Sequence, residues 1–177
     1  MECDQPRMTG ERLAGYINSL PDHRARTALA RCCGSRHWVD AMLAARPFPS
    51  DAALFAAAER EWWALRREDW LEAFGHHPRI GERASDPWAR SEQAGVRGAG
   101  GGAGAVDETR AALAQGNREY EDRFGYVFLI CATAKSAGEM LDALRGRLAN
   151  DPATELRVAA GEQAKITRLR LDKVTAS

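Results

Sequence analysis

The chain has no excess of charge of either sign. Its 177 residues include 25 basic and 25 acidic side chains, so the formal net charge is zero. Without an overall positive field, neither nucleic acid nor an anionic membrane surface is an expected partner. The apolar fraction is 45%, which is enough to form a hydrophobic core. We therefore expect one compact domain that covers residues 1–177.

Long hydrophobic runs are also missing. No segment approaches the ~20 apolar residues of a transmembrane helix, and the N-terminal segment has no apolar stretch of signal-peptide length. The C-terminal Thr175-Ala176-Ser177 differs from the peroxisomal signal Ser-Lys-Leu. We expect a cytoplasmic protein with no membrane partner.

The chain has four cysteines and four histidines. The four cysteines show no Cys-x-x-Cys spacing, and the adjacent Cys32 and Cys33 would form a strained disulfide, which favours reduced thiols. The adjacent His76 and His77 cannot share a helix face as the histidines of His-Glu-x-x-His do. No further cluster completes a metal site, so we expect no metal.

One glycine-rich run superficially suggests a phosphate-binding loop. It extends from Gly98 to Gly104, but no strand precedes it and no Gly-Lys-Ser/Thr ending follows, as a phosphate loop requires. The run therefore indicates a flexible connector or a mobile lid at about 97–105.

Most of the remaining chain has the apolar spacing of amphipathic helices separated by short turns. Helix starts are expected at or near Thr9, Pro21, Trp38, Ser50, Pro87, Val106, Ser136 and Asp151. In the first of these helices Leu13, Tyr16 and Ile17 are predicted to share the apolar face. Ser136 with Glu139 matches a capping box.

A seven-residue apolar run, 126–132, has the composition of a strand, and periodicity alone cannot distinguish a buried strand from a buried helical turn. A single short strand would have no partner. The predicted fold class is therefore all-α, a compact single-domain bundle of about seven to nine helices.

The segment 74–82 is the strongest candidate for chemistry. Pro78 disfavours helical geometry at His77, so His77 is expected in a turn after the helix. A histidine titrates near neutral pH and can act as a general acid or base, although a structural turn histidine would give the same pattern. By composition alone, Glu92 is a solvated helix residue and Lys135 a solvated lysine that could assist an anionic ligand.

The order of several short motifs along the chain resembles the 2-oxo-4-hydroxy-4-carboxy-5-ureidoimidazoline (OHCU) decarboxylase family. The resemblance covers nearly the whole chain, and each motif alone is weak. The motifs are Cys33-Gly34-Ser35 with Trp38, Arg46-Pro47-Phe48, Ala73-Phe74, His77-Pro78-Arg79-Ile80-Gly81, Glu92-Gln93-Ala94-Gly95, Asn117 with Tyr120, Phe124-Gly125, Phe128-Leu129-Ile130-Cys131-Ala132, Arg147-Leu148 with Asn150, Glu155-Leu156, Lys165-Ile166 and Leu169-Arg170-Leu171.

The resemblance implies an all-helical carboxy-lyase of urate degradation, usually a homodimer, which converts OHCU to (S)-allantoin and CO2 without a metal or organic cofactor. It implies that His77 is catalytic, and we expect Glu92 to assist it. The implied substrate-binding residues are Pro78, Ala89, Arg90, Ser91, Gln93, Phe128, Leu129, Ile130, Cys131 and Ala132. Ala89 stands where the family commonly has serine.

Two other readings remain open. The same pocket could serve a catalytically silent helical protein that binds a purine-derived ligand, or the chain could be a helical interaction module without a small-molecule site. Convergence of His77, Glu92 and residues 128–132 would favour the first two readings over the third.

Overall fold

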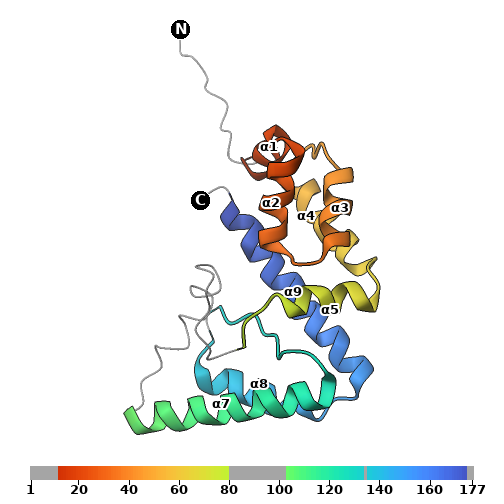
Figure 1. Cartoon of the computed structure of the whole chain (residues 1–177). Coiled ribbons are helices and arrows are strands. Elements are labelled where there is room, and N and C mark those ends of the chain that lie inside the picture. The colour runs from red at the N-terminus through yellow and green to blue at the C-terminus, as the bar shows by residue number, and fades with distance from the viewer. Residues whose placement is uncertain (1–11, 80–102, 134, 175–177) are drawn as a thin grey trace. The chain divides into compact units, whose positions relative to one another are not determined.

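The computed structural model describes residues 12–79, 103–133 and 135–174 (Figure 1). Within these ranges it contains eight helices and no strand, which confirms the predicted all-α class. The helices belong to two compact units, one formed by residues 1–69 and 167–177 and the other by residues 70–166. The helix predicted near Pro87 lies outside the described residues, as does most of the glycine-rich connector.

Four helices form most of the first unit. They are α1 (Arg12–Ser19), α2 (Asp22–Cys32), α3 (Arg36–Ala44) and α4 (Asp51–Trp63). Serine side chains cap two of them: Ser35 accepts a hydrogen bond from the Trp38 N–H, and Ser50 accepts one from the Ala53 N–H at 3.1 Å. Each cap satisfies an N–H group that the helix itself cannot.

The core of this unit is built on tryptophan and leucine. Trp38 is fully buried, and its indole N–H donates to the carbonyl oxygen of Ala58 at 3.0 Å. Other fully buried side chains in the unit are Ile17, Leu29, Met42 and Leu54. The predicted burial of Tyr16 is wrong, because the buried stripe of α1 runs through Ala14 and leaves Tyr16 39% exposed.

The Arg46-Pro47-Phe48 motif connects the end of α1 to the turn before α4 through hydrogen bonds. The Arg46 guanidinium donates to the carbonyl oxygens of Ile17 and Leu20, both at 2.9 Å. Asn18 exchanges two hydrogen bonds with the backbone of Phe48, at 2.8 and 2.9 Å. The Arg46 bonds satisfy carbonyl groups at and just beyond the end of α1, and the Asn18 bonds satisfy the backbone of Phe48.

The second unit contains α7 (Ala103–Phe124) and α8 (Ala137–Leu148). Helix α5 (Arg67–Gly75) ends in this unit, and α9 (Pro152–Lys173) begins in it. The predicted capping box is confirmed at the start of α8, where Ser136 and Glu139 each bond the other's backbone N–H. Helix α7 begins at Ala103, three residues before the predicted start at Val106.

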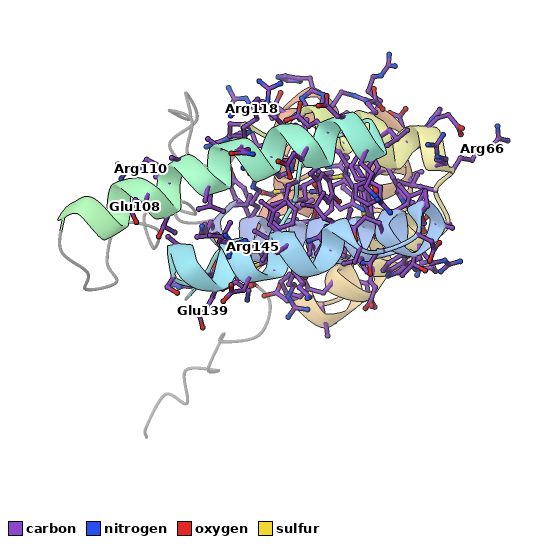
Figure 2. The ribbon with its side chains drawn as sticks, turned by 90° about the horizontal axis from the view of Figure 1, so that it is seen from below. Arg66, Glu108, Arg110, Arg118, Glu139 and Arg145 are labelled. Carbon is purple, nitrogen blue, oxygen red and sulfur yellow. The ribbon has the colours of Figure 1, made fainter. Side chains whose placement is uncertain are left out.

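Helices α7 and α8 lie side by side and run in the same direction (Figures 1 and 2). Arg147 lies over the ring of Tyr120, and Arg123 donates to the carbonyl oxygen of Asn150, so residue numbers rise together along both helices. The helices approach closely at Gly116, where a Cβ atom would lie 2.5 Å from Leu144 Cδ2. Arg118 and Glu139 project from the outer sides of the pair (Figure 2).

A parallel pair of helices requires a connection that returns along their length. Residues 125–133 and 135–136 belong to this connection, which must cover about 20 Å, the length of roughly four helical turns. The apolar run 126–132 lies in this connection and is neither helix nor strand. We call residues 126–132 the return segment.

One acidic side chain in the first unit is predicted to make folding pH-dependent. Asp69 hydrogen-bonds His37 Nδ1 through one oxygen and accepts the Arg66 N–H at 3.1 Å through the other. Burial raises the pKa of Asp69, but the bonds from His37 and Arg66 outweigh it and leave the pKa below its ordinary value.

Because the unfolded chain takes up this proton at a higher pH than the folded one, we expect stability to fall as the pH is lowered from about 5 through the folded pKa of Asp69. An Asp69→Asn variant should lose less stability over this interval than the wild type. Denaturant unfolding of both proteins at several pH values measures the difference. An equal acid-induced loss in both would contradict the assignment.

Candidate functional site

The adjacent histidines follow directly on the end of α5, which stops at Gly75. The His76 N–H donates to the Ala73 carbonyl oxygen at 3.2 Å, and the His77 N–H donates to that of Phe74 at 3.1 Å. His77 thus lies in a turn outside the helix, as Pro78 predicts. His77 and Pro78 are half-buried, whereas His76 is exposed.

Two contacts fix this turn to the end of α7 and the beginning of the return segment. Three residues before His77, the Phe74 ring packs against Tyr126 with centroids 5.3 Å apart. Two residues after it, Arg79 donates to both carboxylate oxygens of Glu121, at 2.6 and 2.8 Å. His77 is therefore held between an aromatic contact and a two-pronged ion pair.

The return segment presents mainly buried apolar side chains. Phe128, Leu129, Ile130 and Ala132 are buried, and Cys131 is half-buried. Because the segment belongs to no sheet in the described structure, its backbone polar groups need partners from elsewhere. Two charged side chains supply one partner each, and the Lys135 N–H donates to the Ala132 carbonyl oxygen at 3.0 Å.

The first is Arg147 of α8, which donates to the Leu129 carbonyl oxygen at 2.6 Å. Its Nε and Nη2 atoms also donate to one oxygen of the fully buried Glu155, at 2.8 and 2.6 Å. The guanidinium lies over the Phe128 ring, 4.6 Å from its centroid. Arginine suits this position because its planar fork serves several acceptors while its face lies on an aromatic ring.

The remaining bonds of Glu155 complete a buried network. The Tyr120 hydroxyl donates to the same oxygen as Arg147, and the Asn150 amide donates to the other at 2.7 Å. Burial raises the pKa of Tyr120, and its hydrogen bond to Glu155 adds to the effect. Tyr120 therefore remains a neutral hydrogen-bond donor.

The second charged side chain is Glu162 of α9. One of its carboxylate oxygens accepts the Cys131 N–H at 2.7 Å, and the other pairs with Lys165 at 2.6 Å. An ionised acceptor makes the bond to Cys131 stronger than one between neutral groups. Arg147 and Glu162 thus hold the return segment at two alternate residues.

The structure brings part of the predicted site into one unit. His77, Pro78 and residues 128–132 all belong to the unit formed by residues 70–166. The other predicted site residues, Glu92 among them, lie outside the described residues. These are Ala89, Arg90, Ser91, Glu92 and Gln93. The individual catalytic and binding roles therefore stay predictions.

Arg147, Glu155 and Glu162 carry structural roles around the site that sequence reasoning missed. In the Glu155-Leu156 motif the charged residue is the fully buried one, and Leu156 is only half-buried. The signal for Glu155 was its place in a family motif beside the Arg147 motif. Glu162 gave no local signal, because its partner is a backbone group far away in sequence.

Within the described ranges, no group of three or more histidine, cysteine, aspartate or glutamate residues could hold a metal ion. None of the helices in these ranges is long and apolar enough to cross a membrane.

The described part of the chain is all-helical, and its histidine-proline turn is attached to an apolar segment through the Phe74–Tyr126 contact. The sequence model of the family described as OHCU decarboxylase matches residues 18–172. The chain therefore belongs to the OHCU decarboxylase family.

Individual relatives agree with this assignment. The uric acid degradation bifunctional protein TTL of Arabidopsis thaliana is 39% identical over 150 residues, which cover 81% of this chain and 45% of the relative. The 2-oxo-4-hydroxy-4-carboxy-5-ureidoimidazoline decarboxylase of Amia calva is 43% identical over 58 residues, 33% of each chain. The matches thus span less than half the length of these two relatives.

A solved structure extends the comparison to the whole fold. The crystal structure of an OHCU decarboxylase in the presence of (S)-allantoin superimposes with a TM-score of 0.74 at 33% identity. The match covers 89% of this chain and all of that chain.

The buried network yields a prediction about stability. Glu155→Ala leaves the Arg147 guanidinium buried without its counter-charge, so we expect the free energy of unfolding to fall by about 3–5 kcal/mol. Arg118→Ala, on the exposed face of α7, should change it by less than about 0.5 kcal/mol. Denaturant titration of both variants tests this. A similar small effect in both would show that the network adds little.

Proposed function

We propose that this chain catalyses the decarboxylation of 2-oxo-4-hydroxy-4-carboxy-5-ureidoimidazoline to (S)-allantoin and CO2, a step of urate degradation. Family membership over residues 18–172 supports the proposal. The observation that carries it is the His77-Pro78 turn, fixed to the return segment through the Phe74–Tyr126 contact. A protonatable side chain and an apolar substrate-binding surface then belong to one site.

The reaction is proposed to need no metal or organic cofactor, because the substrate supplies its own electron sink. Its carboxylate is attached to a ring carbon near an imine. When the bond to the carboxylate carbon breaks and CO2 leaves, the electron pair delocalises into the ring. The protein then has to orient the carboxylate, hold the ureido and ring amide groups, and deliver one proton.

His77 is assigned the proton delivery. Its backbone position is fixed on both sides, and an imidazolium can donate a proton near neutral pH. Delivery to one face of the ring carbanion would give the (S) product. The apolar side chains of the return segment would exclude water, which limits protonation from the other face.

The remaining assignments complete the site. Glu92 is proposed to accept hydrogen bonds from the substrate hydroxyl or ureido N–H groups, and Gln93 can both donate to and accept from a urea-like edge. Pro78, with residues 89–91 and 128–132, would form the rest of the binding surface. Backbone groups of residues 128–132 would also contribute to this surface, as the family resemblance implies.

We further propose that the protein is one domain over residues 1–177 and a cytoplasmic homodimer. The match to residues 18–172 as one family unit supports the single domain. The thiols of Cys32, Cys33 and Cys131 suit a reducing compartment. The homodimer rests on the family resemblance, and light scattering after size exclusion would measure it.

The activity is tested by circular dichroism of freshly generated substrate, prepared from urate with urate oxidase and hydroxyisourate hydrolase. We expect the wild type to accelerate the (S)-allantoin signal and His77→Gln to lower kcat by about 100-fold to 10,000-fold, the contribution of a general acid. His76→Gln, the matched control at the exposed neighbour, should stay close to wild type.

No acceleration over the slow racemic background would contradict the proposal. If the inactive protein still bound (S)-allantoin, it would be the catalytically silent binding protein instead. Loss of activity in both histidine variants, with folding intact, would contradict the specific role of His77.

A further inference from the structure

The return segment is held by side chains at alternate residues. Arg147 donates a hydrogen bond to the Leu129 carbonyl oxygen at 2.6 Å, and Glu162 accepts one from the Cys131 N–H at 2.7 Å. In an extended chain, the N–H and C=O groups of successive residues point to opposite edges. The carbonyl oxygen of residue 129 and the N–H of residue 131 are groups that one edge of such a chain offers, and among the described residues no hydrogen bond to the Ile130 backbone is present.

We propose that Arg147 and Glu162 are positioning residues that fix the return segment, so that the backbone N–H and C=O of Ile130 face the substrate. This inference rests on the proposed function, because it takes residues 128–132 as part of the binding surface. Neither side chain is assigned contact with substrate. Both act through the backbone that they hold.

The two contacts differ in how far they also support the fold. Arg147 belongs to the buried network of Glu155, Tyr120 and Asn150, so its removal affects folding as well. Glu162 contributes less to the fold. Its side chain is 14% exposed, and its other partner is the Lys165 side chain, which is 64% exposed. Glu162 is therefore the cleaner position for a test.

The chain offers a matched control for Glu162. Lys165→Ala removes the ion pair to the same carboxylate but leaves the bond from the Cys131 N–H to Glu162 intact. Glu162→Ala removes both. Glu162→Gln keeps an oxygen that can accept the Cys131 N–H, so it should partly restore what Glu162→Ala loses.

The experiment measures kcat and KM for OHCU, thermal unfolding, and hydrogen exchange of the Cys131 amide in full-length wild type and the three variants. We expect Glu162→Ala to speed exchange at Cys131 and to lower kcat/KM by about tenfold to a hundredfold, the effect of misplacing a substrate-orienting group. Lys165→Ala should leave kcat/KM close to wild type, and Glu162→Gln should lie between.

The proposal would be overturned if Glu162→Ala kept the kcat and KM of the wild type, whether or not its unfolding temperature changed. Glu162 would then have only a structural role. Equal losses in Glu162→Ala and Lys165→Ala would also overturn it. A wild type without turnover would instead contradict the proposed function. The positioning role would then be judged by (S)-allantoin binding, and weakening by Glu162→Ala alone would support it.

For Arg147 the comparison is with Asn150→Ala, which removes one hydrogen bond to the same Glu155 carboxylate. Arg147→Lys keeps the charge but loses the fork that serves both Glu155 and Leu129. We expect Arg147→Lys to lower kcat/KM per folded molecule at least tenfold more than Asn150→Ala. Equal kcat/KM in the two variants would remove Arg147 from the proposal.

Discussion

The parallel arrangement of α7 and α8 is the constraint on which the described site depends. Two helices that run in the same direction need a connection that returns along them, and that connection carries the apolar residues 126–132. Because the described part of this segment pairs with no strand, charged side chains satisfy its backbone. Arg147 and Glu162 perform this role, and Arg147 is paired with the buried Glu155, where loss of either partner of the pair is costly.

The histidine turn is attached to the same framework. Phe74 and Arg79 contact Tyr126 and Glu121 on either side of His77, so the turn and the return segment meet at the end of α7. A decarboxylation in which the substrate itself accepts the electron pair requires a rigidly held site more than it requires many reactive groups. Under the proposed function, the protein would contribute orientation, exclusion of water and one proton.

Much of the fold was predictable from local signals. Ser50 and the Ser136–Glu139 box identified helix starts because capping is a short-range interaction. The conformation of the apolar run 126–132 could not be predicted from its hydrophobic periodicity, because it follows from the direction of α8 relative to α7. Glu155 was missed because its burial depends on Arg147, and charged residues are seldom buried without such a partner. The predicted roles of Glu92 and its neighbours stay predictions.

The measurement that tests this account most directly is an NMR titration of the amide resonances of the wild type with (S)-allantoin. The account predicts that the Ile130 amide and the resonances of His77 shift together, with one dissociation constant, while amides of α1 to α4 stay unchanged. Binding that shifts resonances elsewhere and leaves Ile130 and His77 unmoved would contradict the location of the site.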